Sequence, residues 1–511
     1  MRRDVPGLAI RPQIRFITGE RGARGRARPR AMEATRRMSE FERETIVALS
    51  TAPGRGAIAV VRLSGAKALP VLTGIFRPRK KRSAFPKGRP VLGRFMDGGQ
   101  AFDEGLALYH QAPDSVTGED VVEMHCHGGP AIVGTILRLA REMGARPAVE
   151  GEFTRRAFLE GKIDLVQAEA VADLVAAQTE KAARAALNHL EGRLSQALEG
   201  VWEKIVEAGA HIEAAIDFPD EFEPGAGPTV SGAPMGSAEL AGLFAEIEEA
   251  LERLIESYRS GRILREGARV AILGRPNAGK STLLNALLGA DRAITSEIPG
   301  TTRDTVEEVC DFGGAPVRLI DTAGLRDTGD PVELEGTERA RKAAGEADLS
   351  LMVLDITAGD SEVAWAVREA RALDCENLFV FNKMDKATLQ TQERARAALR
   401  ESAPDAQEAV FISALTGEGL PKLRGEVARV LMDEGGLSGT ESVLTRERHH
   451  GQIAKCLEAV RSARAGAEGD ISPELVAVHL NEAQAALAEL LGRDYGKALL
   501  DKIFSTFCIG K

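Results

Sequence analysis

The stretch ARVAILGRPNAGKST, residues 268–282, carries the strongest structural signal in this chain of 511 residues. Residues 274–281 within it fit the pattern G-x-x-x-x-G-K-[ST], which is typical of a loop that holds phosphate groups. Its two glycines let the backbone wrap closely round an anion, and the loop N–H groups and the following helix N-terminus point at that anion. Lys280 is then placed to reach the β- and γ-phosphates, and Ser281 to offer a hydroxyl to Mg²⁺.

The flanking residues supply the secondary structure that such a loop needs. The apolar run Val270–Leu273 precedes it and predicts a buried strand, and leucines at helical spacing follow it over residues 283–288. A glycine-rich turn that binds nothing would not require this context. We therefore predict a P-loop domain of the α/β class over residues 263–436.

Further segments of the sequence indicate that the bound nucleotide is GTP. Residues 321–324, DTAG, follow an apolar run, and an acid at the carboxyl end of a strand is where a P-loop fold holds a second Mg²⁺ contact. In NKMD, residues 382–385, the carboxylate of Asp385 accepts the guanine N1–H and N2–H₂ donors, which adenine lacks. SAL, residues 413–415, closes the base pocket, and GTTRD, residues 300–304, falls where a mobile switch is expected, with its second threonine on Mg²⁺.

This set of motifs resembles the translation-factor-related GTPases over about residues 267–429. Leu325 stands where Ras-like GTPases carry a glutamine that orients the attacking water, so catalysis needs another polar group. Glu333 and Glu335 lie in the following glycine- and proline-broken loop. Judged from the residues alone, either acid fits this role, and both also fit a solvated surface.

The bulk composition suggests about three domains and no membrane protein. No stretch of about eighteen apolar residues occurs, so no membrane partner is expected. The five cysteines lack paired spacing, which favours a reducing compartment and a cytoplasmic location. His125-Cys-His127 has no second Cys/His pair at ligand spacing, which argues against zinc.

The flanking domains are organised around the P-loop domain. Residues 1–38 are an arginine-rich extension predicted to be disordered; a transit peptide, a nucleic-acid-binding arm and an extension upstream of a later start all remain open. Residues 39–160 predict an α+β domain, with strands at 45–49 and 57–63. Residues 161–262 and 437–511 are helical, so we predict a discontinuous helical domain into which the P-loop domain is inserted.

Segments outside the P-loop domain extend the resemblance to a specific family. TIVALSTAPGRG (45–56), GEDVVEMHCHGGP (118–130), GEFTRRAFLEGKIDLVQAEA (151–170) and FCIGK (507–511) resemble the tRNA-modification GTPase family MnmE, also called TrmE. The match runs in order over about residues 42–511. This implies a GTP-hydrolysing enzyme that modifies certain tRNAs with an FAD-dependent partner, MnmG (GidA), in a heterotetramer.

The chemistry implied by the resemblance is addition of an aminomethyl or carboxymethylaminomethyl group to C5 of the wobble uridine. The one-carbon unit comes from a tetrahydrofolate derivative (5-formyl or 5,10-methylene) bound by the N-terminal domain, which also forms the homodimer. By position, the folate contacts fall on Arg62, Glu123, Lys162 and Lys511. Cations suit the glutamate tail of a folate, and a carboxylate suits the pterin N–H edge.

The resemblance also implies a potassium-activated GTPase, in which a cation supplies positive charge near the reacting phosphates. Its K⁺ ligands would be Asn277, Ser296, Ile298 and Thr301, its Mg²⁺ ligands Ser281 and Thr302, and its catalytic residues Glu333 and Lys280. The complete set of predicted GTP-binding residues is Asn277, Ala278, Gly279, Lys280, Ser281, Thr282, Ser296, Glu297, Ile298, Pro299, Gly300, Thr301, Thr302, Asp321, Thr322, Ala323, Gly324, Asn382, Lys383, Asp385, Ser413 and Ala414.

Several readings stay open at this point. Cys508 is either a nucleophile or a packing residue. A run of basic residues over 77–89 either contacts tRNA or MnmG or is a solvated loop. The main alternative function is a ribosome-assembly GTPase that binds rRNA, and a second is a one-carbon enzyme with a regulatory GTPase attached.

Overall fold

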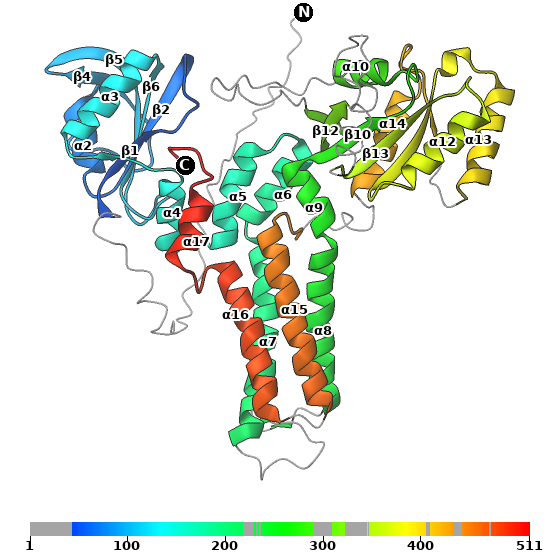
Figure 1. Cartoon of the computed structure of the whole chain (residues 1–511). Coiled ribbons are helices and arrows are strands. Elements are labelled where there is room, and N and C mark those ends of the chain that lie inside the picture. The colour runs from blue at the N-terminus through cyan, green and yellow to red at the C-terminus, as the bar shows by residue number, and fades with distance from the viewer. Residues whose placement is uncertain are drawn as a thin grey trace, which may run out of the picture.

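The chain folds into three parts with different architectures. The computed structural model describes residues 43–217, 229–230, 233–234, 237–290, 309–321, 345, 347–404, 409–432, 442–469 and 472–511. Figure 1 shows a sheet with two helices near the start of the chain, a set of long helices, and a second sheet flanked by helices. In these ranges no helix combines the length and the apolar character needed to cross a bilayer.

The first sheet has seven strands in the order β3-β4-β5-β6-β2-β1-β7, and its pairs are antiparallel except for β1 with β7. Side chains alternate across such a sheet, and Val61 and Met124 point to the face that α2 and α3 cover. Arg62 and Glu123 alternate with them and pair across β2 and β6 on the other face. The bounds are β1 Ile46–Leu49, β2 Gly56–Ser64, β3 Phe76–Pro78, β4 Val91–Asp97, β5 Gln100–His110, β6 Val121–Gly128, β7 Arg146–Pro147, α2 Ala68–Ile75 and α3 Pro130–Glu142.

Four long helices, α7, α8, α15 and α16, form one apolar core, although the P-loop region separates the first two from the last two in sequence (Figure 1). Ile205, Phe244, Val460 and Leu487 are among its fully buried members. The helices of this region are α4 Glu152–Leu159, α5 Leu165–Ala176, α6 Glu180–Leu190, α7 Arg193–Asp217, α8 Ser237–Glu256, α9 Tyr258–Glu266, α15 Glu447–Glu468, α16 Pro473–Leu491 and α17 Lys497–Phe504.

The helical periodicity expected from residue 162 to residue 211 is broken into three helices. Thr179 accepts a hydrogen bond from Ala182 N and so begins α6 as an N-cap. Gly192 has a φ of 83°, which ends the α6 segment before α7 begins. Val175, at the end of the expected apolar stripe, is 53% exposed, because α5 ends one residue later.

The second sheet has six strands in the order β11-β12-β10-β13-β14-β15, all parallel except β11. Apolar clusters form on both faces, as a parallel sheet covered by helices requires. The bounds are β10 Ala268–Leu273, β11 Val309–Phe312, β12 Ala315–Asp321, β13 Leu349–Asp355, β14 Glu376–Asn382, β15 Val410–Phe411, α10 Lys280–Ala290, α12 Asp360–Ala370, α13 Leu389–Ser402 and α14 Leu420–Met432. Two short strands, β8 (Thr229–Val230) and β9 (Ala233–Pro234), form a separate two-stranded sheet.

A buried carboxylate on α5 binds the start of the helical segment that follows the P-loop domain. Glu169 is 2% exposed and accepts hydrogen bonds from Arg448, and His449 Nε2 lies 2.5 Å from its Oε2. Burial alone would raise the pKa of Glu169, but the contact with His449 and the charges of Arg448 and Arg446 lower it. One turn further along α5, Asp173 accepts from Arg446 at 2.7 Å.

The last residues of the chain return to the first sheet. Ser50 Oγ donates to Gly510 O at 3.0 Å, and Phe153 N donates to Lys511 O at 3.1 Å. Gly510 has a φ of 95°, and a Cβ there would lie 2.3 Å from Leu49 O. Only glycine fits this position, so the C-terminal segment is held against β1 by its backbone.

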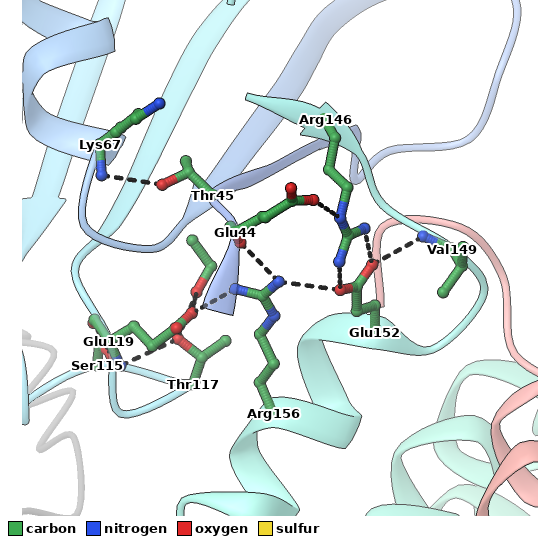
Figure 2. A network of polar contacts seen from close by, with 11 residues as sticks. Glu44, Thr45, Lys67, Ser115, Thr117, Glu119, Arg146, Val149, Glu152 and Arg156 are labelled. Atoms are coloured by element: carbon green, nitrogen blue, oxygen red, sulfur yellow. Dashed lines mark hydrogen bonds and ion pairs between the residues drawn. The ribbon is translucent and has the colours of Figure 1, made fainter. Parts of the chain in front are cut away.

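A buried arginine, Arg156, and a half-buried one, Arg146, link the first sheet to α4. Figure 2 shows Arg156 donating to Glu119 (2.8 Å), to Glu152 (2.9 Å) and to the carbonyl of Glu44 (2.8 Å). Arg146 also donates to Glu152, at 2.8 Å. Burial alone would raise the pKa of Glu152, but hydrogen bonds from Arg146, Val149 N and Arg156 lower it. Glu152 therefore stays ionised and stabilises the fold at pH values above its ordinary pKa.

We expect Arg156→Ala to destabilise the N-terminal sheet by about 3–5 kcal/mol, because buried Glu152 and half-buried Glu119 would keep their charges with less compensation. Hydrogen exchange followed on peptides from β1 and β6 should accelerate, while peptides from α15 and α16 should not change. Arg138→Ala is the control, because Arg138 is 48% exposed and pairs only at the surface. Equal exchange in the two variants would contradict a structural role for the Arg156 network.

Candidate functional site

The phosphate-loop sequence lies between β10 and α10, as its pattern predicts. A Cβ on Gly274 would lie 2.3 Å from Val353 O, and a Cβ on Gly279 would lie 2.3 Å from Asn382 Nδ2. Gly274 is therefore required by the close approach of the β13 backbone, and Gly279 by the close approach of the Asn382 side chain, as well as by the turn. Asn277, at the exposed tip of the loop, takes a left-handed φ of 65°.

Lys280 and Ser281 open α10, where the backbone N–H groups of a helix carry partial positive charge. Lys280 Nζ donates to the carbonyls of Gly274 (2.9 Å) and Arg275 (3.0 Å), so its ammonium lies over the loop. Ser281 and the next residue are exposed in the first turn of the helix. A cation, a hydroxyl and a helix N-terminus thus converge on one concave stretch of backbone, as phosphate binding needs.

Asn382, the last residue of β14, ties three predicted segments together. It is 2% exposed, and its Nδ2 donates to Ala278 O at 2.9 Å. Its Oδ1 accepts from Ala414 N at 2.9 Å and from Lys383 N at 2.8 Å. The phosphate loop, the NKMD segment and the SAL segment therefore meet at one side-chain amide. The sequence motifs predicted that these segments would be neighbours, and the structure supplies the hydrogen bonds between them.

Asp385 and Lys383 are each held by a partner. Ser413 Oγ donates to Asp385 Oδ1 at 2.7 Å, which orients the carboxylate expected to recognise guanine. Lys383 has a φ of 69°, unusual for a residue with a side chain, and its Nζ donates to Asp355 Oδ2 at 2.6 Å. Burial would raise the pKa of Asp355, but hydrogen bonds from Lys383 and Thr357 lower it, so this carboxylate stays ionised.

Sequence reasoning missed Asp355 and the environment of Arg275. Asp355 ends the apolar run of β13, so it carried the same signal as Asp321, an acid at the carboxyl end of a parallel strand. The Arg275 guanidinium lies 5.4 Å from the ring centroid of Trp365, and Nη1 lies 3.5 Å from Glu362 Oε2. These contacts join the phosphate loop to α12, and nothing in the spacing of the sequence indicated them.

The structure describes several predicted residues only in part or not at all. For Asp321 it gives the backbone, which is the last residue of β12 and pairs in register with Ile272. The others that lie outside the described residues are Ser296, Glu297, Ile298, Pro299, Gly300, Thr301, Thr302, Thr322, Ala323, Gly324 and Glu333.

A second polar cluster lies on the face of the first sheet opposite α2 and α3. Arg62 donates to Glu123 Oε1 through Nε (3.0 Å) and Nη2 (2.7 Å). Interaction with His125, which outweighs the opposing effect of burial, and interaction with Arg62 lower the pKa of Glu123 to about 2. Since His125 Nε2 lies 3.5 Å from Glu123 Oε2, at the limit of a hydrogen bond, we regard the shorter Arg62 contacts as the firmer ones.

The structure brings the C-terminal residue to this pair through Phe153. The Arg62 guanidinium lies 5.8 Å from the Phe153 ring centroid, and Phe153 N donates to Lys511 O. The Lys162 side chain lies next to the loop before β6. A Cβ built on Gly118 of that loop would be 3.5 Å from Lys162 Cε. Cys508 is exposed in the same C-terminal segment.

We expect Asp355→Asn to weaken binding of a guanine nucleotide by about tenfold, because Lys383 would lose the charged partner that holds its left-handed backbone in place. Fluorescence titration with a labelled GDP measures this directly. Asp360→Asn is the matched control, because Asp360 pairs with Arg394 on the exposed surface of the same part of the chain. Equal affinities in the two variants would contradict the positioning role of Asp355.

Comparison with known proteins places the chain in a family. A model of the MnmE helical domain matches residues 165–508, and a model of the N-terminus of GTP-binding protein TrmE matches residues 45–162. Relatives named tRNA modification GTPase MnmE from Symbiobacterium thermophilum, Roseiflexus sp. and Moorella thermoacetica are 44%, 41% and 40% identical, each over 92% of this chain and 99% of the relative. The chain therefore belongs to the MnmE (TrmE) family of tRNA-modification GTPases.

Proposed function

We propose that this chain hydrolyses GTP as part of a tRNA-modifying enzyme. With an FAD-dependent partner, MnmG, it would add an aminomethyl or carboxymethylaminomethyl group to C5 of the wobble uridine, using a one-carbon unit from a tetrahydrofolate. The observation that carries the proposal is the Asn382 amide, which holds the phosphate loop and both base-recognition segments in one arrangement. Membership of the MnmE family supports tRNA as the class of substrate.

In the GTPase reaction a water attacks the γ-phosphorus of GTP and releases GDP and phosphate. Lys280 would stabilise charge on the β- and γ-oxygens, and Asp385 would select guanine through its two N–H donors. Ser281 and Thr302 would hold Mg²⁺, which neutralises charge on the phosphate oxygens when bound. Glu333 is proposed as the polar group that positions the water, because Leu325 cannot.

A monovalent cation site is proposed at the tip of the phosphate loop. Asn277 presents a side-chain amide there, and an amide oxygen is a suitable ligand for a hard cation. Ser296, Ile298 and Thr301 would complete the K⁺ ligands. Such a cation supplies positive charge near the phosphates, the role an arginine has in other GTPases.

The polar face of the first sheet is proposed as the folate site. Arg62 lies against Phe153, which binds the C-terminal residue, and the lowered pKa keeps Glu123 ionised as an acceptor for the pterin N–H groups. Lys162 and Lys511 would then meet the anionic glutamate tail. The same N-terminal domain is proposed to form the homodimer, and two chains with two MnmG subunits would make the heterotetramer.

A cytoplasmic location is proposed for this enzyme. All five cysteines of the chain are free, and three of them are buried, as in a reducing compartment. The alternative function, a ribosome-assembly GTPase that binds rRNA, is not favoured, because family membership covers the N-terminal and helical regions as well as the nucleotide site.

GTP hydrolysis should be several-fold faster in KCl than in NaCl at equal ionic strength, because the proposed site takes K⁺, which supplies positive charge near the reacting phosphates. Asn277→Ala should remove most of this stimulation while leaving the slow rate in NaCl. The measurement is phosphate release under saturating GTP. Equal rates in both salts would remove the K⁺ site from the proposal and leave a GTPase.

Glu123→Gln should weaken binding of 5-formyltetrahydrofolate by about tenfold or more, because a charge-assisted hydrogen bond contributes about 1.5–3 kcal/mol. Isothermal titration calorimetry measures the affinity. The contribution of Glu123 is present above its ordinary pKa of 4.5 and is lost only as the pH falls towards about 2, so wild-type affinity should show no titration from this group near neutral pH. An unchanged affinity in Glu123→Gln would place the folate elsewhere.

A further inference from the structure

One edge of the first sheet carries a concentration of cations that the proposed GTP and folate sites do not use. The segment from β3 through its loop to β4, residues 76–94, contains no acidic residue. Its eight basic residues, here called the basic edge, are all exposed: Arg77, Arg79, Lys80, Lys81, Arg82, Lys87, Arg89 and Arg94.

The loop between β3 and β4 is fastened to the sheet at three points. Arg79 N donates to Leu92 O at 3.0 Å, and Gly88 N donates to Tyr109 O at 2.7 Å. Between these bonds, Phe85 turns inward, and its ring centroid lies 6.2 Å from that of Phe76 in an edge-to-face contact. The backbone that presents the cations is therefore ordered before any partner arrives, which lowers the entropic cost of binding.

Most of this charge has no internal partner. Arg79 and Arg94 share one carboxylate, Glu104, at 2.7 Å and 3.7 Å. At the tip of the loop, Lys80, Lys81 and Arg82 form no ion pair with any carboxylate of the described residues. Three adjacent cations without a counter-charge repel one another, and a polyanion relieves that repulsion.

We propose that the basic edge binds the phosphate backbone of tRNA, an inference that rests on the proposed function. The chain as a whole has a net charge of −10, so its body repels a nucleic acid, and a local cationic surface must supply the attraction. Charge alone also suits an acidic protein. Protein interfaces, however, centre on aromatic and arginine side chains packed in desolvated pockets, whereas here Phe85, the only aromatic residue of the loop, packs against the core and the cations are exposed.

The position of the basic edge fits a tRNA whose wobble base lies beside a folate bound at the Arg62–Glu123 pair. Three strand spacings separate β3 from β6, which is about 14 Å. A few nucleotides span this distance, so phosphates beside the anticodon reach the basic edge while the modified base lies on the sheet. Contacts with the tRNA phosphate backbone fix the position of the tRNA on the protein and do not read its base sequence. This suits an enzyme that acts on several tRNAs.

The test is the triple variant Lys80→Gln, Lys81→Gln, Arg82→Gln in the full chain, with binding of a labelled tRNA followed by fluorescence anisotropy over about 50–200 mM salt. Loss of three phosphate contacts should lower the affinity at least about tenfold and make the slope of log K against log salt shallower by about 2–3. The arginine-rich N-terminal segment is present in every protein compared, so it does not contribute to the difference.

The matched control removes three other exposed cations, Lys204, Arg253 and Arg461, by the same change to glutamine. These residues lie on the long helices, so net charge falls equally, and we expect tRNA affinity and slope close to wild type. A tip variant with wild-type affinity and slope would overturn the inference, as would a loss shared equally by the control. A wild-type chain that binds no tRNA would instead contradict the proposed function itself.

Discussion

The buried carboxylate of Glu169 is the constraint on which the arrangement of this chain depends. A carboxylate removed from water costs several kcal/mol unless it is paired, and here Arg446 and Arg448, both from the segment that follows the P-loop domain, supply the charge, while His449 Nε2 contacts the same carboxylate. Asp173, one turn away, receives Arg446 from the same segment and Arg265 from α9, which precedes that domain. The segments that enter and leave the inserted P-loop domain are thus both bound to α5. A single residue separates α9 from β10, so the phosphate loop follows directly from this joint.

The two proposed sites are built on different principles. The nucleotide site is formed largely by backbone, since Gly274 lies so close to the β13 backbone, and Gly279 so close to the Asn382 amide, that a Cβ would not fit. Its side chains mainly hold loops in place, as Asn382 does with three hydrogen bonds. The polar face of the first sheet is formed by side chains of regular strands, where the register of β2 with β6 sets Arg62 opposite Glu123. A loop can close round phosphates, whereas a flat sheet presents groups to a planar ring and leaves room for a macromolecule.

Much of the nucleotide site was predictable because its signals are local. The loop pattern, the strand before it and the helix after it lie within a few residues, and the guanine-recognition segments follow apolar runs that are strands in the structure. The Asp355–Lys383 pair and the stacking of Arg275 on Trp365 were not predicted, because their partners are far apart in sequence. The buried network of Arg156 was hidden for the same reason, since it joins Glu44, Glu119 and Glu152 across three segments. The roles proposed for Glu333 and Thr302 remain predictions from the sequence.

The sequence by itself determined the class of the central domain, the order of its motifs and the helical character of the regions on either side. These properties follow from short-range periodicity and from glycines whose backbone no other residue can adopt. The tertiary structure alone decided which side chains of the two helical parts meet in their shared core, that the last residue is bound to Phe153, whose ring lies against Arg62, and that the basic loop is anchored by Phe85. These arrangements depend on contacts between residues up to hundreds of positions apart, which packing selects and local pattern does not encode.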